Sequence, residues 1–138
     1  MKKTVKTSKK GFTLVELIVI LVILAILAAM LVPALTGYIK RARQEKDYQF
    51  AATVLTAAQS AATYQYSKTK SRATAITQDT SCGGQSNMTV AELVGETSKV
   101  SWTCNFSINS KFVITGGTVT INKVEYEWDG AVWTVNEN

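Results

Sequence analysis

The chain has 138 residues and a formal net charge of +5 at pH 7, and it contains no histidine. Five lysines lie in residues 2–10, so the rest of the chain balances ten basic against ten acidic side chains, which argues against a basic nucleic-acid-binding face on a folded domain. Without histidine the chain lacks the usual general base and the commonest metal ligand, and we predict no catalytic residue, metal or cofactor.

Residues 17–39 form an uncharged and largely apolar stretch. As a helix rising about 1.5 Å per residue, this stretch would extend about 34 Å, enough to cross the hydrocarbon core of a bilayer. The lysines before it favour a cytoplasmic N-terminus, although Lys40, Arg41 and Arg43 follow it. In this orientation everything after Ile39 is exported.

The segment from Lys9 to Glu16, KKGFTLVE, joins the lysines to the apolar stretch. A secretory signal peptide also begins with lysines and an apolar core, but here the apolar run is long and has no clear Ala-x-Ala exit. Thr13 and Glu16 have the spacing of a helix capping box. A carboxylate at the edge of a hydrocarbon layer is costly unless it is paired, so Glu16 also calls for a positive partner.

We predict one long helix from Thr13 to about Ser67. Pro33 lies inside it and predicts a kink or a soft turn between Leu27 and Gly37. Residues 40–66 have an apolar side at three- and four-residue spacing, which predicts an amphipathic second half. The residues of this side are Ala51, Val54, Leu55, Ala58 and Ala62.

Residues 68–98 are rich in Ser, Thr, Gln and Gly and predict a connecting loop. Within it, Thr89 and Glu92 have capping-box spacing, and Gly95 could end a short helix.

From Val100 to Ile108, apolar residues or Cys104 alternate with polar residues, which predicts a half-buried strand. Three possible turns follow. A turn at 116–117 (Gly-Gly) would pair Ile114 with Val119. A turn at 129–130 (Asp-Gly) would pair Trp128 with Ala131.

The third possible turn, Asn122-Lys123, would pair Ile121 with Val124, but lysine is a poor second turn residue and a bulge in one longer strand is the alternative. The predicted fold is α+β, with the second half of the helix packed on an antiparallel meander of four or five strands. Four aromatic residues fall on the apolar face of this meander and are predicted to be core rather than a sugar-binding platform: Trp102, Tyr126, Trp128 and Trp133.

This N-terminal region resembles the class III signal and N-terminal helix of the type IV pilin family. The features that carry the resemblance are the lysine-rich leader, Gly11-Phe12, Glu16, and Pro33 within the apolar helix. The resemblance covers Lys9 to about Arg43. It implies cleavage by a prepilin peptidase between Gly11 and Phe12, and methylation of the new Phe12 amine. It further implies assembly through Phe12, Glu16 and Pro33, with Glu16 meeting the N-terminal amine of a neighbouring subunit and the helix near Pro33 loosened in the filament.

The implied organisation is a cleaved leader (1–11), an apolar half-helix (12–39) and a head (40–138), which consists of helix 40–67, loop 68–98 and meander 99–136. The implied partners are further copies of the chain, the prepilin peptidase, the assembly platform in the membrane, and lipid before assembly. The implied location is the cytoplasmic membrane and then an extracellular pilus.

Cys82 and Cys104 both lie in the exported part, where a disulfide between them would persist and join the polar loop to the first strand. The alternative is that they are free or otherwise paired. Two further functions stay open: a pseudopilin of a type II secretion or DNA-uptake machine, and a monomeric membrane-anchored binding module. An enzyme is the least favoured class.

Overall fold

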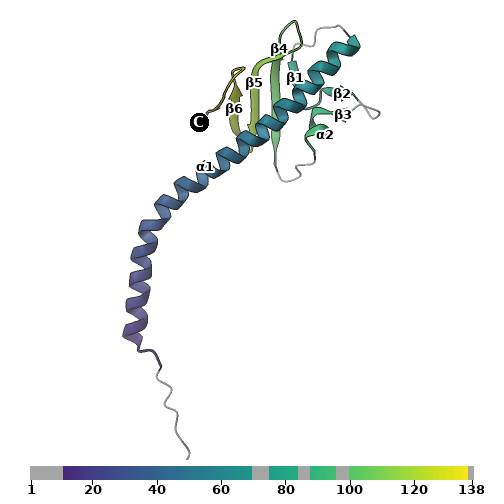
Figure 1. The fold of residues 1–138 in the computed structure, drawn as a ribbon. Helices are drawn as coiled ribbons and strands as arrows, with labels where there is room; N and C mark the ends of the chain where they lie inside the picture. The colour runs from purple at the N-terminus through teal and green to yellow at the C-terminus, as the bar shows by residue number, and fades with distance from the viewer. Residues whose placement is uncertain (1–10, 70–74, 84–87, 96–99, 137–138) are drawn as a thin grey trace, which may run out of the picture. The chain divides into compact units, whose positions relative to one another are not determined.

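The computed structural model describes residues 11–69, 75–83, 88–95 and 100–136 (Figure 1). The chain divides into two compact units, one ending at Ala42 and one beginning at Arg43, within the predicted head of residues 40–138. The elements in chain order are α1 (Leu14–Thr69), β1 (Ala75–Thr77), β2 (Ser81–Gly83), β3 (Met88–Thr89), α2 (Val90–Val94), β4 (Trp102–Ile108), β5 (Ile114–Ile121), β6 (Val124–Trp128) and β7 (Trp133–Asn136).

Helix α1 has 56 residues and confirms the predicted single long helix. It continues as α-helix through Pro33, whose missing N–H leaves the carbonyl of Ala29 without its usual helical donor. One turn later, the Thr36 hydroxyl donates to the carbonyl oxygen of Pro33 at 2.8 Å. The loosening of this segment in a filament stays a prediction, because it concerns the assembled state.

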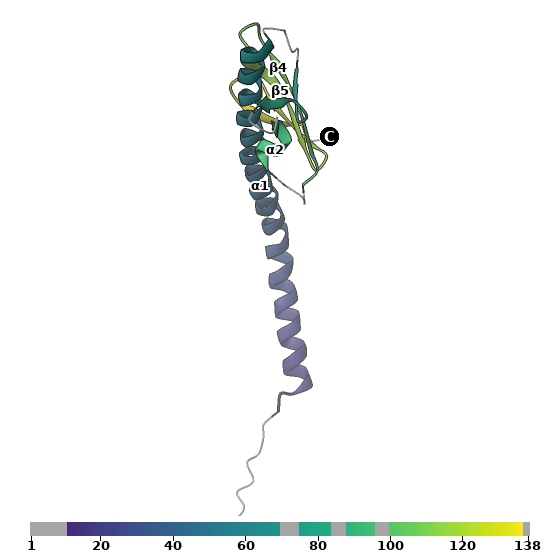
Figure 2. The same ribbon diagram turned by 90° about the vertical axis from the view of Figure 1, so that its right-hand side faces the viewer.

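The second half of α1 packs against one face of a sheet (Figure 2). Its buried stripe confirms the predicted apolar side and consists mainly of alanine, while Leu55 is half-buried at its edge. Because the buried positions of this stripe lie in a packed core, larger side chains there would be costly. The buried residues of the stripe are Ala51, Val54, Ala57, Ala58, Ala61 and Ala62.

The sheet has five antiparallel strands in the order β1-β4-β5-β6-β7, which confirms the predicted α+β class. Strands β4 to β7 form the predicted meander, and β1 comes from the segment 68–98. That segment is therefore more ordered than the predicted loop, since it also contributes the two-stranded sheet of β2 and β3. The predicted short helix is α2, with the Thr89–Glu92 capping box and Gly95 as its C-cap.

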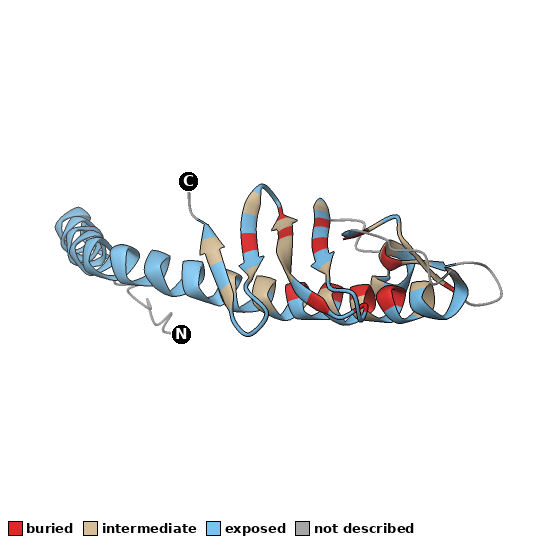
Figure 3. Cartoon of the chain, turned by 90° about the horizontal axis from the view of Figure 1, so that it is seen from above, coloured by how far each residue is buried: buried red, intermediate tan, exposed pale blue. Residues whose placement is uncertain are grey.

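The core lies between α1 and the facing side of the sheet (Figure 3). On β4 the side chains of Cys104 and Phe106 are buried and those of Thr103, Asn105 and Ser107 are exposed, which confirms the predicted alternation. Tyr126 is buried and the three tryptophans are half-buried against the core, so the predicted core role of the aromatic residues is also confirmed. The opposite face of the sheet is polar. Its residues include Thr103, Asn105, Thr118, Thr120, Glu125 and Glu127.

The predicted turn at 116–117 is wrong, because both glycines lie inside β5. Gly116 pairs with Ser107 and Gly117 with Phe106, and the chain reverses earlier, between Ile108 and Ile114. A Cβ on Gly117 would collide with the carbonyl oxygen of Asn105 and would lie 2.6 Å from the Cα of Phe106. The glycine therefore serves a close approach of two strands.

The Asn122-Lys123 turn is confirmed, with Ile121 opposite Val124 and both turn residues at positive φ. The register predicted for the last hairpin is wrong by two residues, since Trp128 pairs with Trp133 rather than with Ala131. A shift of two keeps every side chain on its predicted face, because side chains alternate with a period of two.

Asp129 is the reason for the longer last turn. Its carboxylate accepts hydrogen bonds from the amides of Ala131 and Val132, both at 2.8 Å, and its own amide donates to the Val132 carbonyl at 3.3 Å. These bonds close a loop from Asp129 to Val132 in place of a two-residue turn.

The same bonds predict a pH dependence. The amides of Val132 and Ala131 hold the pKa of Asp129 below its usual value. Because the folded pKa is the lower one, ionised Asp129 stabilises the fold above the unfolded pKa of about 3.9, and this contribution is lost as the pH falls through the folded value. We expect wild type to exceed Asp129→Asn in stability at about pH 6, and the gap to close at about pH 2. Asparagine keeps an oxygen acceptor but does not titrate. Urea midpoints at both pH values test this, and a gap that does not change with pH would contradict it.

Candidate functional site: the N-terminal end of the long helix

Thr13 and Glu16 fix where α1 begins. The Thr13 amide and hydroxyl donate to Glu16 Oε2 at 2.9 and 3.0 Å, and the Glu16 amide donates back to the Thr13 hydroxyl at 3.3 Å. The amide of Leu17 donates to the Thr13 carbonyl at 3.2 Å and closes the first turn. The predicted capping box is confirmed, and it satisfies amides that a helix start would otherwise leave unpaired.

Gly11 and Phe12 precede the helix and are exposed. The peptide bond between them thus lies in non-helical chain, as a protease substrate segment must. Among the described residues, no atom comes within 4 Å of the position that a Cβ on Gly11 would occupy. The fold itself therefore gives no reason for glycine at this position.

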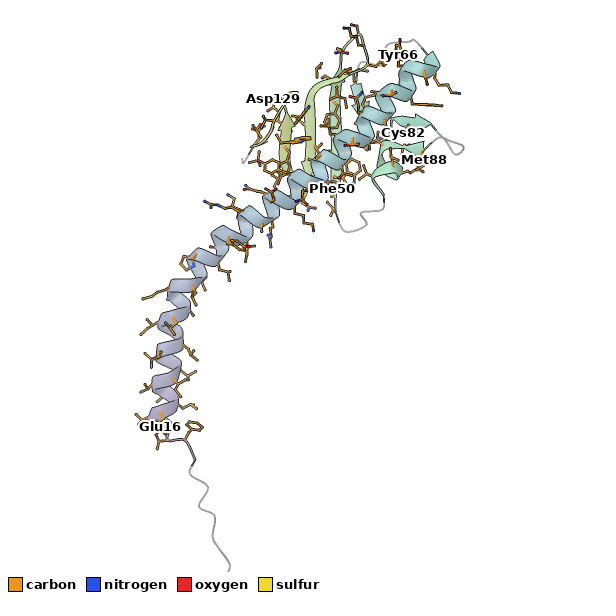
Figure 4. The ribbon with its side chains drawn as sticks, viewed as in Figure 1. Glu16, Phe50, Tyr66, Cys82, Met88 and Asp129 are labelled. Carbon is orange, nitrogen blue, oxygen red and sulfur yellow. The ribbon has the colours of Figure 1, made fainter. Side chains whose placement is uncertain are left out.

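Glu16 is exposed at the start of the helix (Figure 4). The capping bonds engage only Oε2. In the part of the chain that the structure describes, no basic side chain forms an ion pair with this carboxylate. Capping and pairing with an outside cation are therefore compatible, because one carboxylate oxygen stays available.

The first half of α1 carries apolar side chains on every side, and none of its residues is buried. Within the described residues, α1 is the one helix long and apolar enough to cross a membrane, by length and composition. A helix that is apolar all round needs lipid or other helices as cover. Phe12, 82% exposed just before the helix, extends the same apolar surface to the Gly11-Phe12 bond.

The two cysteines lie in the head, Cys82 half-buried on β2 and Cys104 buried on β4. Both are free thiols here, so the disulfide stays a prediction. Burial, with the nearby Asp79 carboxylate, raises the pKa of Cys104 to about 12, and burial also raises the pKa of Cys82. As thiols they would be poor nucleophiles, which fits a structural role. Among the described residues, no group of three or more Cys, Asp and Glu could hold a metal ion.

We expect the exported protein to contain the Cys82–Cys104 disulfide. Mass spectrometry of unreduced peptides should find the two cysteine peptides linked, and reduction should lower stability by about 2–5 kcal/mol. Cys82→Ser should be as unstable as the reduced wild type, since both lack the same bond. If instead the exported protein reacts with a thiol reagent at Cys82 without prior reduction, the disulfide is absent.

Residues 6–32 match the family model described as the prokaryotic N-terminal methylation motif, the class III signal of type IV pilin-like proteins. The match covers the end of the leader, the capped helix start and most of the apolar stretch, and it does not include the head. No curated protein and no solved structure matches the chain. The motif supports a type IV pilin-like protein or a pseudopilin, anchored in a membrane by its helix before assembly.

Proposed function

We propose that this protein is the structural subunit of a type IV pilus, cleaved by a prepilin peptidase after Gly11, methylated at Phe12 and polymerised through the first half of α1. One observation carries the proposal. The matched motif coincides with an exposed, non-helical Gly11-Phe12 bond that leads into a capped apolar helix whose acid has no described cationic partner.

Cleavage after Gly11 has a physical logic. It removes residues 1–11 with all five leader lysines and leaves side chains that balance in charge. It also keeps the apolar helix in the product, whereas a signal peptidase would discard it. The open space around Gly11 suggests that the peptidase, rather than the fold, requires the missing side chain.

Glu16 would then pair with the Phe12 amine of a neighbouring subunit. Each charge alone is costly in an apolar bundle, and the two together become tolerable and fix how far one helix slides along the next. Leaving lipid for a bundle of similar helices gains little hydrophobic energy, so packing and this pair must drive association.

The apolar half-helix and the head would occupy different environments before and after assembly. The half-helix 12–39 first lies in the cytoplasmic membrane with its N-terminus inside, and the head 40–138 outside. It then enters the filament through the assembly platform, and the helix loosens near Pro33. Continuous helical density from Ala28 to Gly37 in a filament map would contradict the loosening.

A pseudopilin is the second candidate, because the methylation motif supports it equally. It would form short filaments confined to the cell envelope, as part of a secretion or DNA-uptake machine. A monomeric membrane-anchored binding module is a candidate of another class, in which Glu16 only caps the helix.

The test is electron microscopy of cells with and without the gene, with mass spectrometry of sheared material. Long filaments that depend on the gene, and a mature chain beginning at methylated Phe12, are the expected results. Filaments confined to the envelope would favour the pseudopilin. An uncleaved monomer that stays in the membrane would overturn both.

A further inference from the structure

The end of the apolar stretch is followed at once by a dense group of basic side chains. Lys40, Arg41, Arg43 and Lys46 lie within seven positions after Ile39, and we call this group the basic segment. Helix α1 continues through the basic segment without a break. Arg41, Arg43 and Lys46 are exposed, and none of the three forms an ion pair with a described residue. Their charges are therefore available to a partner outside the chain.

Two acids lie among these basic residues, but they do not cancel the positive charge. Asp47 is half-buried and accepts a hydrogen bond from the Tyr126 hydroxyl at 2.8 Å, so its carboxylate is engaged by the sheet. Glu45 is exposed. Four basic side chains against two acidic ones leave residues 40–47 with a formal charge of +2.

The spacing along α1 places the basic segment at the level of lipid headgroups. The apolar stretch 17–39, about 34 Å long as a helix, covers a hydrocarbon core of about 30 Å, and the headgroup layer beyond the core is about 5–7 Å thick on each side. At about 1.5 Å per residue, Arg43 lies about 6 Å beyond Ile39. The long side chain of Lys46 can reach back to the same layer.

Tyr38 supports this placement. Its side chain is 72% exposed, and it directly precedes the last apolar residue and the basic segment. Tyrosine is enriched where a membrane helix meets the headgroups, because its ring is apolar and its hydroxyl is polar.

The proposed removal of the leader changes which end of the apolar helix carries positive charge. The leader holds five lysines in residues 2–10, whereas residues 12–39 contain neither lysine nor arginine. In the mature chain the basic segment would therefore hold all the basic side chains next to the apolar stretch. Basic residues flanking a membrane helix favour the cytoplasmic side, so four of them on the exported side run against the usual bias and call for a compensating ligand.

We infer that the basic segment binds anionic phospholipid headgroups at the outer surface of the cytoplasmic membrane and so holds the subunit at a fixed depth before assembly. The inference rests on the proposed orientation and processing, and deepens them by naming the lipid partner. The guanidinium groups of Arg41 and Arg43 can each donate two parallel hydrogen bonds to a phosphate. A headgroup with a net negative charge is favoured over a zwitterionic one, because the segment itself carries net positive charge.

Native mass spectrometry of the full chain tests this preference. The chain is isolated in a neutral detergent and equilibrated with equal amounts of phosphatidylglycerol and phosphatidylcholine, and the lipids that stay bound are identified by mass. Wild type should retain mainly phosphatidylglycerol. The triple variant Arg41→Gln, Arg43→Gln and Lys46→Gln should lower the ratio of bound phosphatidylglycerol to phosphatidylcholine about tenfold or more. Glutamine is a good helix former, so α1 should be preserved.

Two further variants serve as controls. The triple variant Lys68→Gln, Lys111→Gln and Lys123→Gln removes the same charge elsewhere in the head, so its lipid ratio should stay near that of wild type. The double variant Arg41→Lys and Arg43→Lys keeps the charge but loses the paired hydrogen bonds, so its ratio should fall by about threefold or less.

The same lipid ratio in wild type and in the triple variant of the basic segment would overturn the inference. An unchanged ratio together with a loss of filaments would also overturn it, and would assign the basic segment to a contact between subunits. The mass of each chain shows separately whether residues 1–11 have been removed, so a failure of the proposed processing is distinguished from a failure of lipid binding. An uncleaved leader would add the same lysines to every variant, and the comparison between variants would still decide the inference.

Discussion

Replacing Glu16 with alanine should leave cleavage after Gly11 intact and reduce filament number about tenfold or more. The methyl group cannot pair with the Phe12 amine of the neighbouring subunit, so that amine enters the apolar bundle as an unpaired charge. Breaking a buried ion pair by removing one partner costs about 3–5 kcal/mol. Immunoblots of the processed chain and filament counts by electron microscopy measure the two effects separately.

Two further variants separate the charge of Glu16 from its capping role. Glu16→Gln keeps side-chain atoms that can cap the helix but removes the charge, so it should assemble as poorly as the alanine variant. Thr13→Ala removes the capping hydroxyl at a cost of about 1 kcal/mol but keeps the charge, so it should retain most filaments. Normal filament numbers in Glu16→Ala would count decisively against the pairing. Normal numbers in Glu16→Gln alone would leave capping as the role of Glu16.

The parts of the fold that the sequence predicted well are those with a long period or a specific local signature. Helix α1 could be predicted because its apolar and amphipathic halves extend over many turns, with Pro33 and the nearby Gly37 as the strong interruptions. The capping boxes at Thr13 and Thr89 depend on residues three apart, so they are visible without tertiary context. The face of each meander residue was also predictable, because alternation survives a two-residue error in register.

The missed strand β1 comes from a contact between distant segments. Strand β1 is only three residues long and exists because it pairs with β4, where Ile76 lies opposite Phe106. Nothing local in a Ser- and Thr-rich segment signals such a strand, since strand propensity depends on packing partners. The extended last turn has a local cause instead, because the Asp129 carboxylate accepts from amides two and three residues ahead and so competes with the tighter Asp-Gly turn.

The residues of the candidate site could be predicted from the sequence, but the proposed partner of Glu16 could not be seen in it. Gly11, Phe12, Glu16 and Pro33 follow from a linear motif, but the proposed partner of Glu16 belongs to another copy of the chain, so neither this sequence nor one subunit displays the pair. The apolar stripe of α1 was visible in the sequence, but the polar bond that joins the helix to the sheet was not. The Tyr126 hydroxyl donates to Asp47 at 2.8 Å, across 79 positions of the chain. Such a pair becomes visible only when the fold brings its members together.

Gly117 provides the sharpest test of the corrected fold. If residues 116–117 were a type I′ turn, both glycines would need positive φ and both would resist substitution. In β5 only Gly117 has positive φ, at 149°, and only its added Cβ would collide with β4. A Cβ on Gly116 would lie 3.1 Å from the Trp128 carbonyl oxygen, so the neighbouring backbone would have to move by only a few tenths of an ångström.

We therefore expect Gly117→Ala to lower the free energy of unfolding by about 3 kcal/mol or more, and Gly116→Ala by about 1 kcal/mol or less. An alanine at 117 would strain the backbone, and its Cβ would push β4 and β5 apart. Phe106 is fully buried next to the collision and would lose packing contacts. Urea unfolding of the purified chain in detergent, followed by tryptophan fluorescence, measures both variants, because all three tryptophans lie in the head. Equal losses in the two variants would support a turn at 116–117 and contradict a continuous β5. A loss confined to Gly117→Ala would establish that this glycine is retained for the close approach of two strands.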